Sequence, residues 1–407
     1  MERLKIGLIG TRFAGLDGVT LESIKVARVL ESLGHEVSWF GGLLDPEFSP
    51  GVEVPDAMFD AEANLELNSQ IYGTDTCAPV VLDEIERSAA KLQRHIADFV
   101  AGQQIDLLMP QNSLAIPMHV PLGLAIARLI RDNGVPAIAH HHDFAWERNR
   151  FWPNAVGALL DEAFPPTAPN LGHLVINSLA RNELRNRTRA EARLLPNIMD
   201  FTNAPPPGDG AAFRSACGLS ASDRLVLQPT RMVPRKGIED TLELARLLGD
   251  PGVRVVVTHP EPDEGMAYIE YLTRTADEFG VDFRIVPAGP GTSLGLADAY
   301  AAADLVAYPS RIEGFGNALL EAFYFKRPLL VNRYPVYAAD IGPLGVHAIE
   351  MDGQITEEVV ALAGRWLADP TEWSGAVEAN YGIGRRYFSY EVAADVIKGS
   401  LSDIGLV

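Results

Sequence analysis

Two loops in the second half of the sequence combine charged side chains with glycines. The first, PTRMVPRKG at 229–237, places Arg231 and Lys236 five residues apart, between an expected strand and an expected helix. Two cations followed by a helix N-terminus form a site for a diphosphate, because fixed positive charge and oriented N–H groups both act on phosphate oxygens. A solvated basic loop is the alternative interpretation of the same residues.

The second loop, at 308–328, contains Glu313 and Glu321, separated by seven residues that include two glycines. If Glu313 lies in the loop and Glu321 in the following helix, one carboxylate faces a ligand at the helix start and the other accepts hydrogen bonds from a diol. The alternative is a capping box, Ser310-x-x-Glu313, with Glu321 merely solvated. We expect Phe315, between the glycines, to be an exposed aromatic residue, which a capping box does not explain.

Polar residues also cluster after two strands of the first half. The segment AHHHDFAWERNRFW at 139–152 contains three successive histidines, of which His140 and His142 share a face because strand side chains alternate. His140, His141 and His142 therefore do not all serve one ion, and we expect no metal. Packing is the alternative role for at least one of them. The amides of 111–113 (Gln-Asn-Ser) suit either hydroxyl recognition or a turn cap.

The first glycine-containing loop, IGTRFAGLDG at 9–18, matches neither a dinucleotide fingerprint nor a Walker loop. The segment Gly15–Gly18 instead precedes a helix N-terminus, where backbone N–H groups could approach an anion. A turn that needs glycine geometry is equally consistent with the pattern.

Short apolar runs alternate with helix-period segments, which predicts an α/β protein with two doubly wound parallel sheets. Post-strand loops of two such sheets would surround one cleft. Residues 44–80 show a weaker pattern and contain several Pro, Asp and Glu residues, so we expect an irregular excursion or extra helices there. The strands are expected at Ile6–Ile9, Glu36–Phe40, Asp106–Pro110, Pro136–His140, Arg224–Gln228, Arg254–Thr258, Phe283–Pro287, Leu305–Tyr308 and Leu329–Asn332. The helices are expected at Thr20–Leu33, Asp83–Ala101, Pro121–Asn133, Ile238–Leu248, Gly265–Phe279, Leu296–Ala303 and Asn317–Phe325.

Composition restricts the class of protein. The chain has 407 residues, 47% of them hydrophobic, which suits two globular domains, and a Pro/Gly cluster at 203–210 marks the expected boundary. A net charge of −20 disfavours nucleic acid as a partner. Cys77 and Cys217 form no metal or disulfide pattern. Without a signal peptide or a long apolar stretch, we expect a cytoplasmic protein, with peripheral membrane association left open.

The joint pattern resembles the retaining family-4 (group 1) glycosyltransferases of GT-B architecture. It consists of Arg231 and Lys236, then Glu313-x7-Glu321 with GFG between them. Further matching segments are GHEV at 34–37, the His-Asp pair at 142–143, LPNIMD at 195–200 and RYFSY at 386–390. The likeness covers nearly the whole chain, and the polar segments at 111–113 and 139–152 add a resemblance to bacterial synthases of glycosylated glycerate.

The resemblance implies a role for each matching residue. The catalytic residues would be His142, Arg231, Lys236 and Glu313. The residues contacting the nucleotide-sugar donor would be Gly18, Arg231, Lys236, Glu313, Phe315, Gly316, Asn317 and Glu321. The residues lining the acceptor side would be Asn112, His141, Asp143, Glu147 and Arg148. The loop with Gly18 lacks the family's consecutive glycines, and Lys326 stands where many members have glycine.

The resemblance also implies a domain plan and a reaction. Residues 1–203 would bind the acceptor, residues 204–384 the nucleotide sugar, and residues 385–407 would cross back to the first domain. A hexose would pass from a UDP- or GDP-sugar to a small polyol, hydroxy-acid or saccharide hydroxyl, without metal or separate cofactor. A nucleotide-sugar epimerase and a non-catalytic sugar-nucleotide sensor remain alternatives, and a homodimer stays open.

Overall fold

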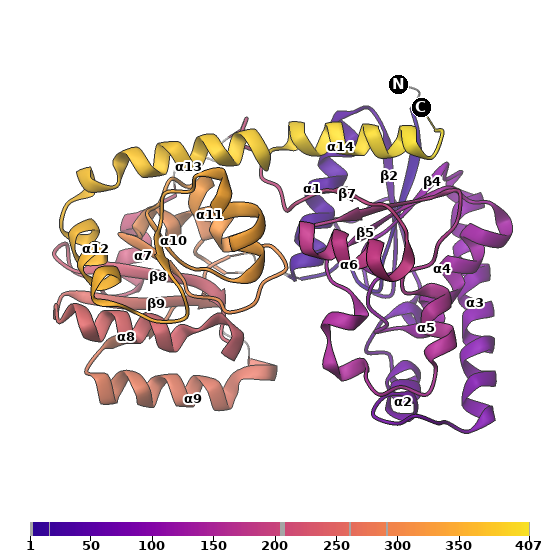
Figure 1. Cartoon of the computed structure of the whole chain (residues 1–407), viewed down its shortest axis with the longest axis horizontal. Helices are drawn as coiled ribbons and strands as arrows, with labels where there is room; N and C mark the ends of the chain where they lie inside the picture. The colour runs from indigo at the N-terminus through magenta and orange to yellow at the C-terminus, as the bar shows by residue number, and fades with distance from the viewer. Residues whose placement is uncertain (1–2, 16, 204–207, 260–261, 290–291, 407) are drawn as a thin grey trace. The chain divides into compact units, whose positions relative to one another are not determined.

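The computed structural model describes residues 3–15, 17–203, 208–259, 262–289 and 292–406. The chain forms two compact units, each with its own sheet (Figure 1). Unit 1 comprises Met1–Pro196 and Tyr390–Val407, and unit 2 comprises Asn197–Ser389. These limits differ by a few residues from the boundaries predicted at 203/204 and 384/385, and residues 204–207 of the Pro/Gly cluster lie outside the described residues.

Unit 1 contains a seven-stranded parallel sheet in the order β3-β2-β1-β4-β5-β6-β7. The strand order reverses between β1 and β4, so the loops that follow these two strands flank the switch point where such sheets bind ligands. The strands are β1 (Lys5–Ile9), β2 (Glu36–Gly41), β3 (Gly51–Glu53), β4 (Leu107–Pro110), β5 (Ala137–His141), β6 (Leu171–Val175) and β7 (Arg193–Leu194). The helices are α1 (Gly18–Ser32), α2 (Glu62–Ile71), α3 (Pro79–Gln103), α4 (Val120–Asn133), α5 (Gly157–Ala163), α6 (Ser178–Thr188) and α14 (Tyr390–Asp403).

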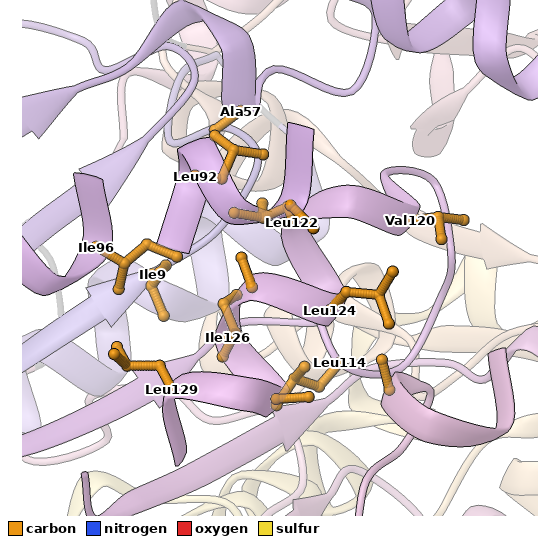
Figure 2. Close-up of a cluster of buried hydrophobic side chains, with 14 of the residues drawn as sticks. Ile9, Ala57, Leu92, Ile96, Leu114, Val120, Leu122, Leu124, Ile126 and Leu129 are labelled. Carbon is orange, nitrogen blue, oxygen red and sulfur yellow. The ribbon is translucent and has the colours of Figure 1, made fainter. Parts of the chain in front are cut away.

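Helix α3 contributes many of the buried side chains of the unit 1 core. It begins with a proline at its first position and ends before Gln104, which adopts a left-handed conformation. Its buried side chains recur every three or four residues, so they form one stripe that packs against α4. Figure 2 shows Leu92 beside Leu122 of α4 and Ile96 beside Ile9 of β1. The stripe therefore fixes the end of β1, where the first functional loop begins.

Helix α14 belongs to unit 1 although it ends the chain. It packs on α1, β6 and β7 (Figure 1). Arg193 of β7 donates from Nε to Asp403 at 2.6 Å, and this ion pair ties the end of α14 to the edge of the sheet. The segment that was expected to cross from Arg385 thus enters unit 1 at Tyr390.

Unit 2 repeats the same winding with a six-stranded parallel sheet, β10-β9-β8-β11-β12-β13, whose order reverses between β8 and β11. The strands are β8 (Arg224–Arg231), β9 (Val253–His259), β10 (Asp282–Ile285), β11 (Leu305–Tyr308), β12 (Leu329–Asn332) and β13 (Ile349–Met351). The helices are α7 (Gly210–Ala216), α8 (Ile238–Leu248), α9 (Pro262–Phe279), α10 (Leu296–Ala302), α11 (Asn317–Tyr324), α12 (Glu357–Ala368) and α13 (Ser374–Tyr387).

The expected α/β winding is confirmed, with element ends displaced by a few residues. Of the two alternatives for residues 44–80, an irregular excursion or extra helices, the structure shows a helix, α2, and it adds the edge strand β3. The pattern there is weak because β3 is only three residues long and α2 buries only Asn64, Leu67 and Ile71. Strands β6, β7 and β13 and helices α5, α7, α12 and α13 were not assigned from the sequence.

Candidate functional site

The switch point of unit 2 brings together Lys236, which follows β8, and Glu313, which follows β11. The Lys236 ammonium donates to one Glu313 carboxylate oxygen, and Arg235 donates to the other at 3.1 Å. The side chains of Lys236 and Glu313 are 11% and 8% exposed. Lys236, expected to act together with Arg231, thus has Glu313 as its partner across the switch point.

Burial and charge act in opposite directions on this pair. Burial lowers the pKa of Lys236, and the negative charge of Glu313 opposes that effect. Burial alone would raise the pKa of Glu313, but the charges of Lys236 and Arg235 outweigh it and lower the pKa overall. The two groups form an ion pair in a largely water-free position, where their electrostatic interaction with an anionic ligand is strong.

Arg231 stands at the same end of the sheet but is exposed. It pairs in register with His259, the last residue of β9. Burial lowers the pKa of His259, and the positive charges of Arg231 and Lys236 lower it further. This end of unit 2 therefore gathers two cations next to an imidazole that stays neutral, which is the charge pattern expected for a phosphate site.

Helix α11 begins beside this pair. Gly316 has a φ of 125°, and a Cβ atom there would lie 2.6 Å from the Tyr334 hydroxyl and 3.1 Å from Tyr308. The Lys236 ammonium lies 5.5 Å from the centre of the Tyr308 ring. Only glycine fits this backbone, so Gly316 brings the uncapped start of α11 to the aromatic residue that also contacts Lys236.

The expectation that Phe315 is exposed is wrong. The residue is 2% exposed, and its ring packs edge-on against Phe388 at 5.2 Å. Its carbonyl accepts a hydrogen bond from the Tyr334 hydroxyl. Aromatic packing between the loop and the C-terminal segment explains Phe315, so any ligand contact there falls to its backbone. The side-chain oxygen of Asn317 accepts a hydrogen bond from Asn197 at 2.6 Å.

Glu321 lies in α11, as expected, and is not simply solvated. The Tyr300 hydroxyl donates to Glu321 at 2.8 Å. Tyr300 is fully buried, and its ring stacks on that of Phe325. Tyr300 also donates to the carbonyl of Ala318 at 3.1 Å. This contact fixes the orientation of a half-buried carboxylate, which suits hydrogen bonding to a ligand hydroxyl.

Three further residues of this site were not predicted from the sequence to have a role in it. The first is Arg235, which donates to Glu313. Gln228, fully buried in β8, donates to the Lys236 carbonyl at 2.9 Å and accepts from Thr241 at 2.6 Å. Gly237 has a φ of 63°, and a Cβ atom there would lie 2.6 Å from the carbonyl oxygen of Pro309. Gln228 could have been noticed in the sequence, because it is a polar residue within an otherwise apolar strand.

In unit 1, hydrogen bonds of the Asn112 side chain connect the loop after β4 to the loop after β5. It adopts a left-handed conformation with a φ of 59°. Its side-chain oxygen accepts from the backbone N–H groups of His142 and Asp143 at 3.0 and 3.3 Å, and its amide donates to Asp143 at 2.8 Å. The structure thus gives Asn112 a role in positioning the loop after β5.

The three histidines lie on alternate faces of the strand end, as strand alternation predicts: His140 and His142 on one face and His141 on the other. The rings of His140 and His142 are 4.3 Å apart, and His140 also contacts the Gln111 side chain at 3.0 Å. His141 is 1% exposed, shares a 2.9 Å hydrogen bond with His173 of β6, and packs on Phe144. The prediction that His141 lines the acceptor side is therefore corrected, because its ring faces the interior.

Burial keeps these histidines neutral. It lowers the pKa of His142 and of His173 to about 4, and it lowers the pKa of His140 and His141 well below the ordinary value. The Nε2 atom of His142 has no hydrogen-bond partner among the described residues. At neutral pH the ring therefore presents an uncharged, unpaired nitrogen at the end of β5.

We expect acid to destabilise unit 1. Unfolded histidines titrate near pH 6.5, so between pH 6.5 and about pH 4 the unfolded chain binds more protons and stability falls as the pH falls. Each histidine contributes a slope of at most about 1.4 kcal/mol per pH unit. Urea unfolding between pH 5 and 7 measures this pH dependence, and His142→Gln should lower the slope. An unchanged slope for His142→Gln would contradict this account.

Asp143, Glu147 and Arg148 surround the same loop. Arg148 donates from Nε to Asp143 at 2.8 Å and makes a second, shorter bond to the same oxygen. Although Glu147 is exposed as a residue, desolvation of its carboxyl group and the charge of Asp143 raise its pKa to about 7. The structure therefore brings His142, Asp143, Glu147 and Arg148 onto one segment after β5.

Gly18 is the first residue of α1, and its N-terminus is already capped. Asp17 accepts hydrogen bonds from the backbone N–H groups of Val19 and Thr20 at 3.0 and 3.1 Å. A carboxylate of the chain therefore occupies two N–H groups at this helix start, and a donor contact at Gly18 stays a prediction. Leu16, in the same loop, lies outside the described residues.

Across the described ranges, no group of three or more His, Cys, Asp or Glu side chains is arranged to hold a metal ion. Both cysteines are free thiols. Of the helices in those ranges, none combines the length and hydropathy that a bilayer crossing requires.

Comparison with known proteins identifies the family. Residues 212–345 match the family described as glycosyl transferases group 1. The mannosylglucosylglycerate synthase of Thermotoga maritima is 30% identical, with 97% of this chain and 99% of the relative aligned. That relative matches the finer resemblance seen in the polar segments of unit 1.

Solved structures show the same fold at low identity. Sucrose-phosphate synthase from Thermosynechococcus elongatus aligns over 98% of both chains with a TM-score of 0.70 and 17% identity. Anabaena HepE in complex with UDP-glucose aligns over 98% of this chain and 100% of its own, with a TM-score of 0.66 and 16% identity. The chain therefore has the GT-B fold and belongs to the group 1 glycosyltransferases.

Proposed function

We propose that this glycosyltransferase moves a hexose from a UDP- or GDP-sugar to a hydroxyl of a small glycoside that carries a hydroxy acid. The reaction would retain the anomeric configuration and use neither a metal nor a separate cofactor. The observation that carries the proposal is the buried Lys236–Glu313 pair across the unit 2 switch point, with Arg231 at the same end of the sheet.

The cations have a direct task in this reaction. When the bond from the sugar C1 to the diphosphate oxygen breaks, negative charge grows on the leaving group, and Arg231, Lys236 and the start of α11 would stabilise it. A donor would then take the place of Glu313 as the partner of Lys236, which frees that carboxylate for the hexose hydroxyls. Glu321, oriented by Tyr300, would accept hydrogen bonds from the ribose diol.

The acceptor hydroxyl would attack C1 on the face from which the diphosphate leaves. The acceptor oxygen forms the new bond to C1, and its proton passes to the departing phosphate oxygen, so no protein nucleophile is needed. The neutral ring of His142 would contact the transferred sugar, with Asp143, Glu147 and Arg148 on the acceptor side. The relative named as a mannosylglucosylglycerate synthase supports glucosylglycerate as acceptor and GDP-mannose among the donors to be tested.

A donor and acceptor screen tests the proposal. Thermal shifts with nucleotides identify the base, and incubation of each sugar nucleotide with glucosylglycerate and other acceptors, in the presence of EDTA, is followed by mass spectrometry and proton NMR of the product. We expect a glycoside with the anomeric configuration of the donor. A new sugar nucleotide formed without acceptor would indicate an epimerase, and a thermal shift without any product would indicate a sensor. An inverted product or loss of turnover in EDTA would contradict the mechanism.

A further inference from the structure

Arg12 lies in the loop after β1, beside the switch point of unit 1. We infer that Arg12 binds the carboxylate of the acceptor substrate and so selects anionic over neutral acceptors. The inference rests on the proposed function, since it names the chemical group that the acceptor must carry.

The backbone around the switch point places Arg12 at the functional edge of the sheet. The carbonyl of Ile9, the last residue of β1, accepts from the Gln111 N–H at 2.8 Å and from the Ser113 hydroxyl at 3.3 Å. These bonds join the end of β1 to the loop after β4, which contains Asn112. Arg12 follows Ile9 by three residues, so its backbone belongs to the edge where doubly wound sheets bind ligands.

The Arg12 side chain is held in place on two sides. Its guanidinium lies 5.1 Å from the centre of the Phe59 ring, and one terminal nitrogen donates to Asp17 at 3.1 Å. The side chain remains 32% exposed. Its Nε atom is buried and has no hydrogen-bond partner among the residues that the structure describes. A buried guanidinium N–H without an acceptor is costly, which favours an anion that approaches this side.

Asp17 is the partner of Arg12 and also caps the start of α1. The Asp17 carboxylate also accepts from the N–H groups of Val19 and Thr20 and from the Thr20 hydroxyl, at 3.0, 3.1 and 2.8 Å. The carboxylate therefore divides its hydrogen bonds between Arg12 and the positive end of the α1 dipole. Asp45, on the neighbouring loop, accepts from the Gly15 N–H at 2.9 Å and anchors the segment.

A carboxylate is the group that this arrangement suits best. A planar guanidinium recognises a planar carboxylate through paired N–H donors, and stacking on Phe59 limits the directions from which a ligand can approach. The diphosphate of the donor is assigned to Arg231 and Lys236 of unit 2, so an anion at Arg12 belongs to the acceptor. A glycerate glycoside carries such a carboxylate, whereas the corresponding glycerol glycoside does not.

The experiment compares two acceptors and two arginines. Glucosylglycerate and glucosylglycerol are tested as acceptors with the full chain, alongside Arg12→Gln, Arg12→Lys and Arg3→Gln. Arg3 is the matched control, because it precedes β1 at the opposite end and pairs with Glu36 at 2.9 Å on the exposed surface. Calorimetry measures binding of glucosylglycerate and of UDP and GDP, and thermal melting confirms that each variant is folded.

We expect Arg12→Gln to raise the KM and the Kd for glucosylglycerate by about 10- to 100-fold. Turnover of glucosylglycerol and nucleotide affinity should stay unchanged, Arg12→Lys should be intermediate, and Arg3→Gln should match the wild type. An equal loss for both acceptors, a loss of nucleotide affinity, or no difference from Arg3→Gln would overturn the inference.

The binding measurement separates this inference from the proposed function. If the wild type binds glucosylglycerate through Arg12 but forms no glycoside with any donor, the transferase proposal fails and the carboxylate site stands. If the wild type transfers a hexose but does not bind glucosylglycerate more tightly than glucosylglycerol, the site at Arg12 is wrong and the transferase proposal stands.

Discussion

Lys236→Gln should lower kcat for hexosyl transfer by about 100- to 1,000-fold, because the ammonium stabilises charge that appears on the leaving diphosphate only as the glycosidic bond breaks. The substitution should also lower the free energy of unfolding by about 3 kcal/mol, since it leaves the buried Glu313 carboxylate with a weaker set of partners. Steady-state kinetics at saturating donor and urea unfolding measure the two effects separately.

A surface lysine provides the control for this change. Lys398→Gln in α14 alters an exposed side chain that pairs with Asp395 at 3.5 Å, and both kcat and stability should match the wild type. Nucleoside binding, which does not involve the diphosphate, should survive in Lys236→Gln and show that the site is folded. Turnover by Lys236→Gln within a few-fold of the wild type would contradict the assignment of the leaving-group site.

Gly316→Ala should destabilise unit 2 by about 2–4 kcal/mol and reduce transfer, because the new methyl group meets the Tyr334 hydroxyl and alanine disfavours a φ of 125°. To make room, Tyr334 must give up its hydrogen bond to the Phe315 carbonyl, which displaces the start of α11. Urea unfolding and donor affinity measure the result.

The same substitution at Gly375 is the matched control. This exposed residue lies in the first turn of α13, and a Cβ atom there meets nothing within 4 Å, so alanine should be neutral or stabilise by up to about 1 kcal/mol. Adding Tyr334→Phe to Gly316→Ala should recover part of the lost stability by removing the clashing oxygen. Equal stability of Gly316→Ala and Gly375→Ala would show that the close contact is not a constraint.

The winding of both units could be predicted from sequence because buried parallel strands appear as short apolar runs between amphipathic helices. The edge elements could not, since β3 and β7 are too short to carry a pattern. Helix α6 has a strongly polar sequence and buries only Ala180 and Leu184, so its helical period is faint.

The site was predictable where charge and glycine coincide, as at Lys236 and Glu313. It was not predictable where pairing depends on tertiary contacts. No local pattern reveals that Glu313 binds Lys236 from a loop 77 residues away, or that Phe315 turns inward onto Phe388. The capping role of Asp17 was visible in principle, because an aspartate directly before a helix is a common N-cap. Lys326, at a position where the resemblance led us to expect glycine, adopts a left-handed φ of 52°, which is a conformation that glycine adopts without strain.

The most direct measurement compares the affinities of a nucleoside and its diphosphate for the wild type and for the Arg231→Gln/Lys236→Gln double variant by calorimetry. The wild type should bind UDP or GDP far more tightly than uridine or guanosine. In the double variant this preference should fall by at least about 100-fold, while nucleoside affinity stays the same. An unchanged preference for the diphosphate would show that these cations do not bind the leaving group.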